Sequence, residues 1–143
     1  MISNTLLHID DDPTFTSLIT RVLATHGWDV DSLNDPAQWC DAISQHRIVL
    51  LDMNMPGYPG IEVLRDIKRF DRTLQVIVVT AVCTLTTVVS CLSSGAEYCF
   101  FKPMDGFEPL VDSLERTRFK IEHWQDAAAS VARQRATARK RTR

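Results

Sequence analysis

The sequence lacks any apolar stretch close to the length of a membrane span, which needs about 20 predominantly apolar residues. Its first residues also lack the basic-then-apolar pattern of a secretory signal. These two absences predict a cytoplasmic protein with no membrane partner. With 143 residues, 45% of them hydrophobic and 24% charged, the chain is long enough for one domain with its own core.

Cysteine pairs at metal-ligand or redox spacing are also missing. The four cysteines form no C-x-x-C pair, no histidine stands near them at ligand spacing, and the four histidines are scattered. Neither a zinc site nor a disulfide is therefore expected, and the thiols are predicted to be reduced and packed in or near the core. The cysteines are Cys40, Cys83, Cys91 and Cys99.

Positive charge is scarce before residue 116. Residues 1–115 carry 7 Lys/Arg and 16 Asp/Glu, a net charge of −9, whereas residues 116–143 carry 9 and 2, a net charge of +7. The sequence therefore predicts an acidic domain followed by a basic tail. We place the domain over residues 4–118 and a basic extension, helical or disordered, over residues 119–143.

Four short hydrophobic runs are present. They have the length of buried parallel strands, which are continuously apolar rather than alternating. The runs cover residues 5–9, 48–51, 75–79 and 98–101. A fifth segment, residues 28–33, alternates and predicts an edge strand.

Helix signals separate these runs. Asp12-Pro13 and Asp35-Pro36 each combine a capping carboxylate with a proline suited to the first helical position. Helices are predicted from 13 to about 26, from 36 to about 45, over 61–67, over 84–94 and from 107 onward. Regular alternation of strand and helix predicts an α/β fold, a doubly wound five-stranded parallel sheet with an extended C-terminal helix.

Polar side chains close the runs. Asp10 and Asp11 follow the first run, Asp52 the second, Thr80 the third and Lys102 the fourth. The carboxyl ends of parallel strands share one edge of the sheet, where such sheets bind ligands. Three clustered carboxylates repel one another unless a cation lies between them, and Mg²⁺ prefers oxygen ligands. This edge is therefore predicted to bind a divalent metal and a phosphoryl group.

Each of these residues has a simpler interpretation when taken alone. Asp12 is interpreted as a helix cap rather than a metal ligand. Thr80 alone could simply end a β-branched strand, and Lys102 alone could be a solvated charge. His8 shares strand parity with Asp10, which places it near the site, but a packed core histidine is the favoured interpretation.

The chain resembles the receiver domain of two-component response regulators, a flavodoxin-like, CheY-like fold. The resemblance covers about residues 4–118 and rests on four pieces in consistent order and spacing. These are LLHIDDDP, IVLLDMNMPGYPGIEVLRDIK, VIVVTA and SSGAEYCFFKP. It implies phosphorelay signal transduction by a switch that regulates through binding. The only catalysis it implies is the chain's own phosphorylation and dephosphorylation.

The resemblance also implies an acceptor and a metal. Asp52 would accept a phosphoryl group from a histidine kinase or a histidine phosphotransfer protein. Mg²⁺ would be held by Asp11 and Asp52, by Asp10 through water, and by the backbone carbonyl of Asn54.

The same resemblance implies contacts to the phosphoryl group. Thr80 and Lys102 would contact its oxygens, and Asn54 and Ala81 would complete the phosphoryl-binding set. Pro103 would follow a cis peptide bond, which is affordable before proline.

One departure from the family concerns its conformational switch. Receivers usually carry Tyr or Phe three residues before the lysine, where its rotation accompanies movement of the threonine; here that residue is Cys99. Cysteine cannot fill the same volume. The switch of Thr80 and Cys99 would then depend on Thr80 alone or on a neighbouring aromatic, and plain packing of Cys99 is favoured over a redox role. Pro59, where the family commonly has Asp, is expected to stiffen the loop after Asp52.

The helix over residues 84–94 contains no charged residue, and an uncharged face can be a partner surface. Its outward positions are predicted to be Thr86, Thr87, Ser90 and Ser93. In the family, the fourth helix, fifth strand and fifth helix commonly form the signalling face. A homodimer through this face is one expectation, and a merely solvated face is the other.

In the tail, Ile121, Trp124, Ala128 and Val131 recur at three- and four-residue steps. This spacing predicts an amphipathic extension of the last helix, one that could pair with a second copy. Basic residues without an acid follow at Arg133, Arg135, Arg139, Lys140, Arg141 and Arg143. Binding to nucleic acid is considered but not favoured, because no aromatic interleaving and no helix-turn-helix accompany these charges.

Two other functions compete. A phosphohydrolase of the haloacid dehalogenase type also uses Asp and Mg²⁺ at strand ends. It needs a second Asp two residues after the nucleophile, where this chain has Asn54. A DNA-binding regulator acting through the basic tail is the other alternative.

Overall fold

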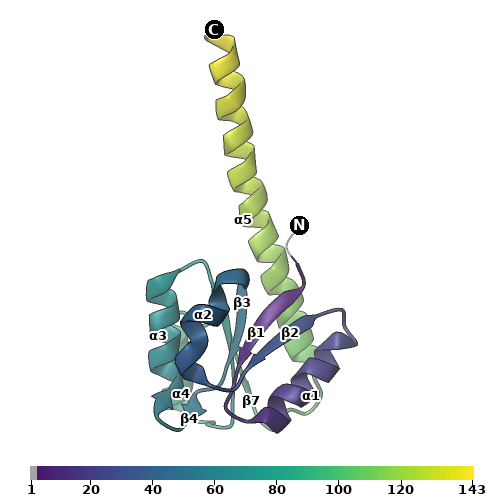
Figure 1. Cartoon of the computed structure of the whole chain (residues 1–143), viewed down its shortest axis with the longest axis vertical. Coiled ribbons are helices and arrows are strands. Elements are labelled where there is room, and N and C mark those ends of the chain that lie inside the picture. The colour runs from purple at the N-terminus through teal and green to yellow at the C-terminus, as the bar shows by residue number, and fades with distance from the viewer. Residues whose placement is uncertain (1–2) are drawn as a thin grey trace.

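Five parallel strands form the central sheet in the order β2-β1-β3-β6-β7 (Figure 1). Their bounds are β1 Thr5–Ile9, β2 Asp29–Leu33, β3 Ile48–Leu51, β6 Gln75–Thr80 and β7 Tyr98–Phe101. The structure is a computed structural model that describes residues 3–143. The predicted sheet is confirmed, and the alternating segment, β2, lies at one of its edges.

Helices cover both faces of this sheet, α1 and α5 on one side and α2, α3 and α4 on the other (Figure 1). Their bounds are α1 Pro13–Ala24, α2 Trp39–Ala42, α3 Gly60–Phe70, α4 Leu85–Ser93 and α5 Glu108–Arg141. The doubly wound α/β prediction is therefore confirmed. As predicted, the Asp12 side chain caps α1, accepting from the backbone N–H groups of Thr14 and Phe15, and the Lys102–Pro103 peptide is cis.

Two apolar cores flank the sheet because buried strand residues point alternately to its two faces. One core joins β1, β3 and β6 to α1 and α5 through Leu6, Leu50, Ile77, Ile19 and Leu114. The other joins the same strands to α3 through Leu7, Val49, Val76, Leu64 and Ile67. Fully burying each such side chain contributes about 1.5–3 kcal/mol, so both cores hold the central strands rigidly in place.

The predicted single helix over 36–45 is wrong in detail. It consists of 3-10 turns at Pro36–Gln38 and Ile43–Gln45 with the short α2 between them. Pro36 and Ile43 are the buried residues of this segment, so packing against the core supports only a short, irregular helix here. A small hairpin, β4 Asn54–Met55 with β5 Tyr58–Pro59, also forms in the loop after β3.

The predicted outward face of α4 is partly wrong. Thr86 and Ser93 are exposed as expected, whereas Thr87 and Ser90 are half-buried and the buried residue of the helix is Cys91. The apolar stripe faces solvent instead, with exposed fractions of 79% for Leu85, 36% for Val88, 51% for Val89 and 73% for Leu92. Helical spacing reveals that such a stripe exists but does not say which way it faces.

The cysteine prediction also needs correction. Cys91 is buried and Cys99 is half-buried, but Cys40 and Cys83 are exposed. Cys40 lies on the short α2, where only one side of an irregular segment meets the core. Cys83 lies in the loop that precedes α4.

Helix α5 is one continuous helix of 34 residues that packs on the domain and then projects beyond it (Figure 1). Its buried residues are Leu110, Ser113, Leu114 and Thr117. The extended C-terminal helix is thus confirmed. The domain boundary at residue 118 stays a prediction, because the helix passes this point without a break. Across residues 3–143, no helix has the length and apolarity that a membrane crossing requires.

Candidate functional site

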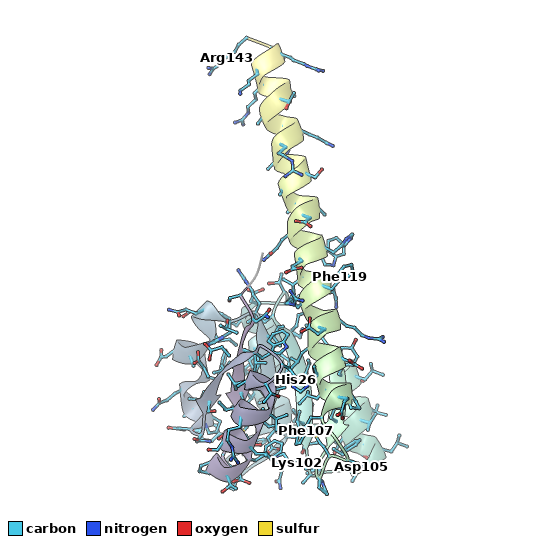
Figure 2. The ribbon with its side chains drawn as sticks, turned by 90° about the vertical axis from the view of Figure 1, so that its right-hand side faces the viewer. His26, Lys102, Asp105, Phe107, Phe119 and Arg143 are labelled. Atoms are coloured by element: carbon cyan, nitrogen blue, oxygen red, sulfur yellow. The ribbon has the colours of Figure 1, made fainter. Side chains whose placement is uncertain are left out.

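The candidate site lies at the carboxyl edge of the sheet. Asp10 follows β1, Asp52 follows β3, Thr80 ends β6 and Lys102 follows β7. These four strands are consecutive neighbours, so the chain delivers all four side chains to one edge. Figure 2 shows Lys102 at the end of the domain opposite to the one from which α5 projects.

Three carboxylates meet at this edge. Asp10, Asp11 and Asp52 each present an oxygen, and these oxygens lie within 4.8 Å of one another. Asp10 is fully buried, Asp52 is 5% exposed, and Asp11 faces solvent. Oxygens at this spacing suit a small divalent cation that takes oxygen ligands and retains several waters, as Mg²⁺ does.

Lys102 supplies the positive charge of the site. Its Nζ donates to Asp10 Oδ2 at 2.6 Å and lies 3.7 Å from Asp52 Oδ2. The ammonium also lies 4.0 Å from the centroid of the Phe15 ring, on the first turn of α1. A cation above an aromatic face is stabilised electrostatically, so Phe15 helps to position Lys102 against the carboxylates.

Backbone N–H groups orient the two buried carboxylates. Asp10 Oδ1 accepts from the N–H of Asp12 at 3.0 Å, and Asp52 Oδ1 accepts from the N–H of Asn54 at 3.2 Å. The amide of Asn34 donates to the backbone carbonyl of Asp10 at 2.8 Å. These bonds fix the loops after β1 and β3 before any ligand is bound.

Gly60 explains how the loop after β3 closes. It is the first residue of α3, and a Cβ at this position would collide with the backbone carbonyl of Asp52 and with Met53. Only glycine allows the helix to begin directly against the site. The hairpin of β4 and β5 fills the intervening loop and leaves the Asn54 side chain exposed.

The remaining predicted residues lie around this centre. Thr80 is fully buried, and its Oγ1 accepts from the N–H of Val82 at 3.2 Å. Ala81, between them, is exposed. Cys99 is half-buried on β7 beside Cys91 of α4, and burial raises its pKa to about 11, so the thiol is neutral at physiological pH.

Burial raises the pKa of the Asp52 carboxyl above its usual value. The N–H of Asn54 and the ammonium of Lys102 lower the pKa, whereas the neighbouring Asp10 raises it further. Ionisation of Asp52 in the folded protein thus carries a free-energy cost that Lys102 alone does not offset. A second cation near these carboxylates would lower this cost.

His8 lies beside the site, as its shared strand parity with Asp10 predicts. It is also a packed core histidine, which was the favoured interpretation. It is fully buried, its Nε2 is 3.9 Å from Asp10 Oδ2, and its ring meets Phe15 edge-on at 5.6 Å between centroids. Neither ring nitrogen has a hydrogen-bond partner within residues 3–143. Burial, and to a lesser extent Lys102, lowers the pKa of His8 to about 3.

This shift predicts that His8 makes the fold acid-sensitive. An unfolded histidine has a pKa of about 6.5, whereas His8 in the folded chain has a pKa of about 3. Between these two pH values the unfolded chain binds a proton at His8 and the folded chain does not, so acid favours unfolding. Between pH 7.5 and pH 5 the free energy of unfolding should fall by about 2 kcal/mol through His8. Urea titrations of the wild type and of His8→Leu measure this contribution, because the variant should lose correspondingly less stability over that range. Equal losses in both proteins would contradict it.

Two contributors to the site were missed in the sequence. Phe15 lies on α1 and Asn34 follows β2, and the sequence predicts neither as a site residue. Nothing in the spacing of either residue points to the site, because their contacts with Lys102 and Asp10 arise only when the strands are assembled.

The fold and this site define a doubly wound α/β domain that gathers carboxylates and a lysine at the carboxyl edge of its sheet. The family model for the response regulator receiver domain matches residues 6–115. The chain belongs to this family, and the resemblance drawn from its motifs is confirmed.

Individual relatives agree with this assignment. The chain is 33% identical over 128 residues to the DNA-binding response regulator MtrA of Mycolicibacterium smegmatis, covering 88% of this chain and 54% of MtrA. It is 32% identical over 107 residues to the sporulation initiation phosphotransferase F of Bacillus subtilis, covering 73% of this chain and 86% of that protein. The chain therefore spans about half the length of its MtrA relatives.

Solved structures support the fold. A response regulator receiver domain protein from Clostridium thermocellum superposes with a TM-score of 0.77 at 22% identity, covering 84% of this chain and 98% of that one. The response regulator protein TrrA from Thermotoga maritima, in complex with Mg²⁺-BeF, superposes with a TM-score of 0.71 at 23% identity. The latter match covers 82% of this chain and 99% of TrrA.

Proposed function

We propose that this receiver domain acts in phosphorelay signalling and that Asp52 is its phosphoacceptor. The observation that carries the proposal is the meeting of Asp10, Asp11 and Asp52 within 4.8 Å, with Lys102 beside two of them. The donor would be a phosphohistidine on a histidine kinase or on a histidine phosphotransfer protein. During transfer the N–P bond of the donor breaks while an oxygen of Asp52 forms the new O–P bond.

We assign Mg²⁺ to the three carboxylates, Asp10, Asp11 and Asp52, together with the backbone carbonyl of Asn54. When bound, the ion neutralises charge on the phosphoryl oxygens, because phosphoryl transfer depends mainly on positioning and electrostatic stabilisation. The raised pKa of Asp52 and the clustering of the carboxylates both favour a divalent cation here.

The neighbouring residues would hold the phosphoryl group. Lys102 can turn from the Asp10 carboxylate toward phosphoryl oxygens, since its Nζ already lies 3.7 Å from Asp52 Oδ2. The Thr80 hydroxyl would donate a hydrogen bond to the same group. Asn54 and Ala81, which flank the pocket on the exposed side, would contact it from the loops after β3 and β6.

Output would follow from binding rather than from catalysis on another substrate. The chain would catalyse only its own phosphorylation and, by attack of water on the aspartyl phosphate, its own dephosphorylation. The phosphohydrolase alternative is not supported, because Asn54 cannot act as the acid/base that such enzymes carry two residues after the nucleophile. We place the protein in the cytoplasm, where histidine kinases present their phosphoryl groups.

The face formed by α4, β7 and α5 is the surface through which phosphorylation would act on a partner or on a second receiver. The exposed apolar stripe of α4 supports this assignment, because large exposed apolar patches mark interaction sites. Thr80 lies at the end of β6, beside β7. With Cys99 in place of the usual aromatic residue, movement of Thr80 would reach α4 through the thiols of Cys99 and Cys91 rather than through a rotating ring.

Acetyl phosphate and intact-protein mass spectrometry test the proposal. The chain should gain the mass of one phosphoryl group when Mg²⁺ is present and should gain none after EDTA treatment, since removal of the cation leaves the carboxylates to repel the incoming phosphate. Restoring Mg²⁺ should restore the gain. Labelling that proceeds equally well in EDTA would overturn the metal assignment, and no labelling under any condition would overturn the function.

Binding to nucleic acid is a weaker alternative. MtrA is a DNA-binding response regulator, but this chain spans only 54% of MtrA. The basic residues here lie on the projecting part of α5, at the end of the molecule opposite to Lys102 (Figure 2). Retention on immobilised DNA that falls with salt and disappears when residues 119–143 are removed would support this alternative.

A further inference from the structure

The apolar stripe that anchors α5 to the domain continues after the helix leaves it. Leu110, Leu114 and Thr117 are buried against the sheet, and Ile121 is half-buried at its edge. The same face then carries Trp124, Ala128 and Val131. Steps of three and four residues keep all of these side chains on one side of a helix.

This continuation has no partner within the described chain. Trp124 is 66% exposed and Val131 is 50% exposed. An indole seldom stands free on an isolated helix, because covering it removes a large apolar area from water. Most helical stability in proteins comes from packing of an amphipathic face, so contact with another surface would stabilise the projecting part of α5.

A groove lies where the helix leaves the domain. It has a volume of about 430 Å³ and a mainly apolar lining. Ile121, Trp124 and Ala128 form its helical wall, and Arg47 and Thr73 belong to its opposite wall at the amino edge of the sheet. Arg47 faces Asp71 at 3.6 Å, so its charge is already partly balanced. The groove is open to a segment that lies along the stripe of α5.

We propose that a second copy of this chain covers the stripe, with the two projecting α5 helices packed against each other in antiparallel orientation. The sequence beside the stripe suits a helical partner. Gln125, Ala127, Ala132 and Gln134 flank it and carry no charge, and the alanines allow close approach. In an antiparallel pair of the projecting turns, Ala128 and Val131 of the two copies meet at the centre, and the last turns of each helix cover Trp124 of the other.

The position of the domain selects the antiparallel orientation. Because α5 packs on its own domain with the stripe side, the domain occupies the space in front of the stripe before residue 121. A parallel partner helix would have to pass through this space to reach its own domain. An antiparallel partner helix instead ends where the domain begins, near residue 121, with its last turn close to the groove beside Trp124.

Charge favours the same orientation. The end of α5 and the two residues after it carry six basic residues without an acid: Arg133, Arg135, Arg139, Lys140, Arg141 and Arg143. A parallel pair would place both sets of six cations side by side. An antiparallel pair separates them and brings each set to the amino edge of the other copy's domain, where Asp71 and Glu97 lie beside Arg47 and Lys120.

Nucleic acid fits this surface less well. At 100° per residue, the six basic residues are spread around the helix rather than gathered on one face. The apolar face of the helix carries its largest exposed side chain, and an apolar face makes no favourable contact with a phosphate backbone. A protein helix is therefore the better occupant.

Sedimentation of the full, unphosphorylated chain without Mg²⁺ tests the pairing separately from Asp52 chemistry. The chain should sediment as a dimer, and Trp124→Ala and Val131→Asp should each weaken the dimer at least about tenfold, as expected when an interface anchor worth at least about 1.4 kcal/mol is removed. Phe119→Ala is the matched control, since Phe119 is 73% exposed but lies on the opposite side of α5 and should leave the dimer unchanged. A monomer at 100 µM (roughly the range where a micromolar dimer is complete), or a dimer that Trp124→Ala and Val131→Asp leave intact, would overturn the proposal, as would a dimer that forms only on DNA.

A distance measurement tests the orientation. A spin label on Thr142→Cys, in a chain whose exposed Cys40 and Cys83 are replaced by Ser, reports the separation of the two helix ends. At 1.5 Å per residue, antiparallel packing over the projecting turns puts the two labels about 30 Å apart, whereas parallel packing puts them within about 15 Å. The shorter distance would overturn the antiparallel arrangement. Circular dichroism of each variant shows whether α5 is retained.

Discussion

Replacing Asp52 with asparagine is expected to abolish phosphorylation by acetyl phosphate. The substitution keeps the shape of the side chain and an oxygen that can accept from the N–H of Asn54, now at 3.2 Å. It removes the carboxylate nucleophile, and a neutral amide cannot form an acyl phosphate. Intact-protein mass spectrometry should show no phosphoryl gain in Asp52→Asn under conditions that label the wild type completely.

The fold should tolerate this change. Burial raises the pKa of Asp52, and the neighbouring Asp10 raises it further. An ionised Asp52 therefore destabilises the folded state, and the neutral amide avoids this destabilisation. Chemical unfolding should therefore show Asp52→Asn to be at least as stable as the wild type in EDTA. Asp66→Asn, which changes an exposed acid on α3, is the matched control and should label like the wild type. Undiminished labelling of Asp52→Asn would place the acceptor elsewhere.

The carboxyl edge of the sheet could be predicted because several local signals agree there. Each buried run ends where a polar residue begins, and parallel strands of one sheet end on the same side. Asp10, Asp52, Thr80 and Lys102 were therefore placed together without any tertiary information. Their spacing in the sequence, however, could not say that Lys102 contacts Asp10 at 2.6 Å rather than Asp52.

The outward face of α4 could not be predicted in the same way. An apolar stripe on a helix normally faces the core, and Leu85, Val88, Val89 and Leu92 form such a stripe. In the structure these side chains face solvent, and the smaller Cys91 is the buried residue of the helix, beside Cys99 of β7. β7 is an edge strand whose residues are all only half-buried, so α4 covers a narrow surface beside Cys99. The spacing of apolar residues in the sequence does not reveal which strand α4 packs against or how wide that surface is.

Phe15 and Asn34 show a related limit. Each looks like an ordinary residue of its own segment, one on an apolar helix face and the other after an edge strand. Their roles beside Lys102 and Asp10 depend on the packing of α1 and β2 against β1, which joins residues far apart in the sequence. Contacts of this kind appear only once the sheet order is known.

Replacing Lys102 with methionine is expected to destabilise the fold by about 3–5 kcal/mol in EDTA. Asp10 is fully buried, and its Oδ2 accepts from Lys102 Nζ at 2.6 Å. Methionine has an unbranched side chain of similar length but no charge, so the substitution leaves two buried carboxylates facing each other without a cation. Breaking a buried pair on one side is costly because the remaining charge stays desolvated. Urea unfolding in EDTA measures the loss.

Mg²⁺ should recover much of this loss, because a cation among Asp10, Asp11 and Asp52 replaces the missing ammonium. A ligand at 100 times its dissociation constant stabilises the folded state by about 2.7 kcal/mol, and the gain should be larger in Lys102→Met than in the wild type, where Lys102 repels the ion. Lys120→Ala is the matched control: Lys120 pairs with Glu97 at 2.8 Å on the surface, so its loss should cost less than about 1 kcal/mol and be indifferent to Mg²⁺. If Lys102→Met unfolds like the wild type in EDTA, or gains no more from Mg²⁺, then Lys102 does not balance these carboxylates and the electrostatic account of the site fails.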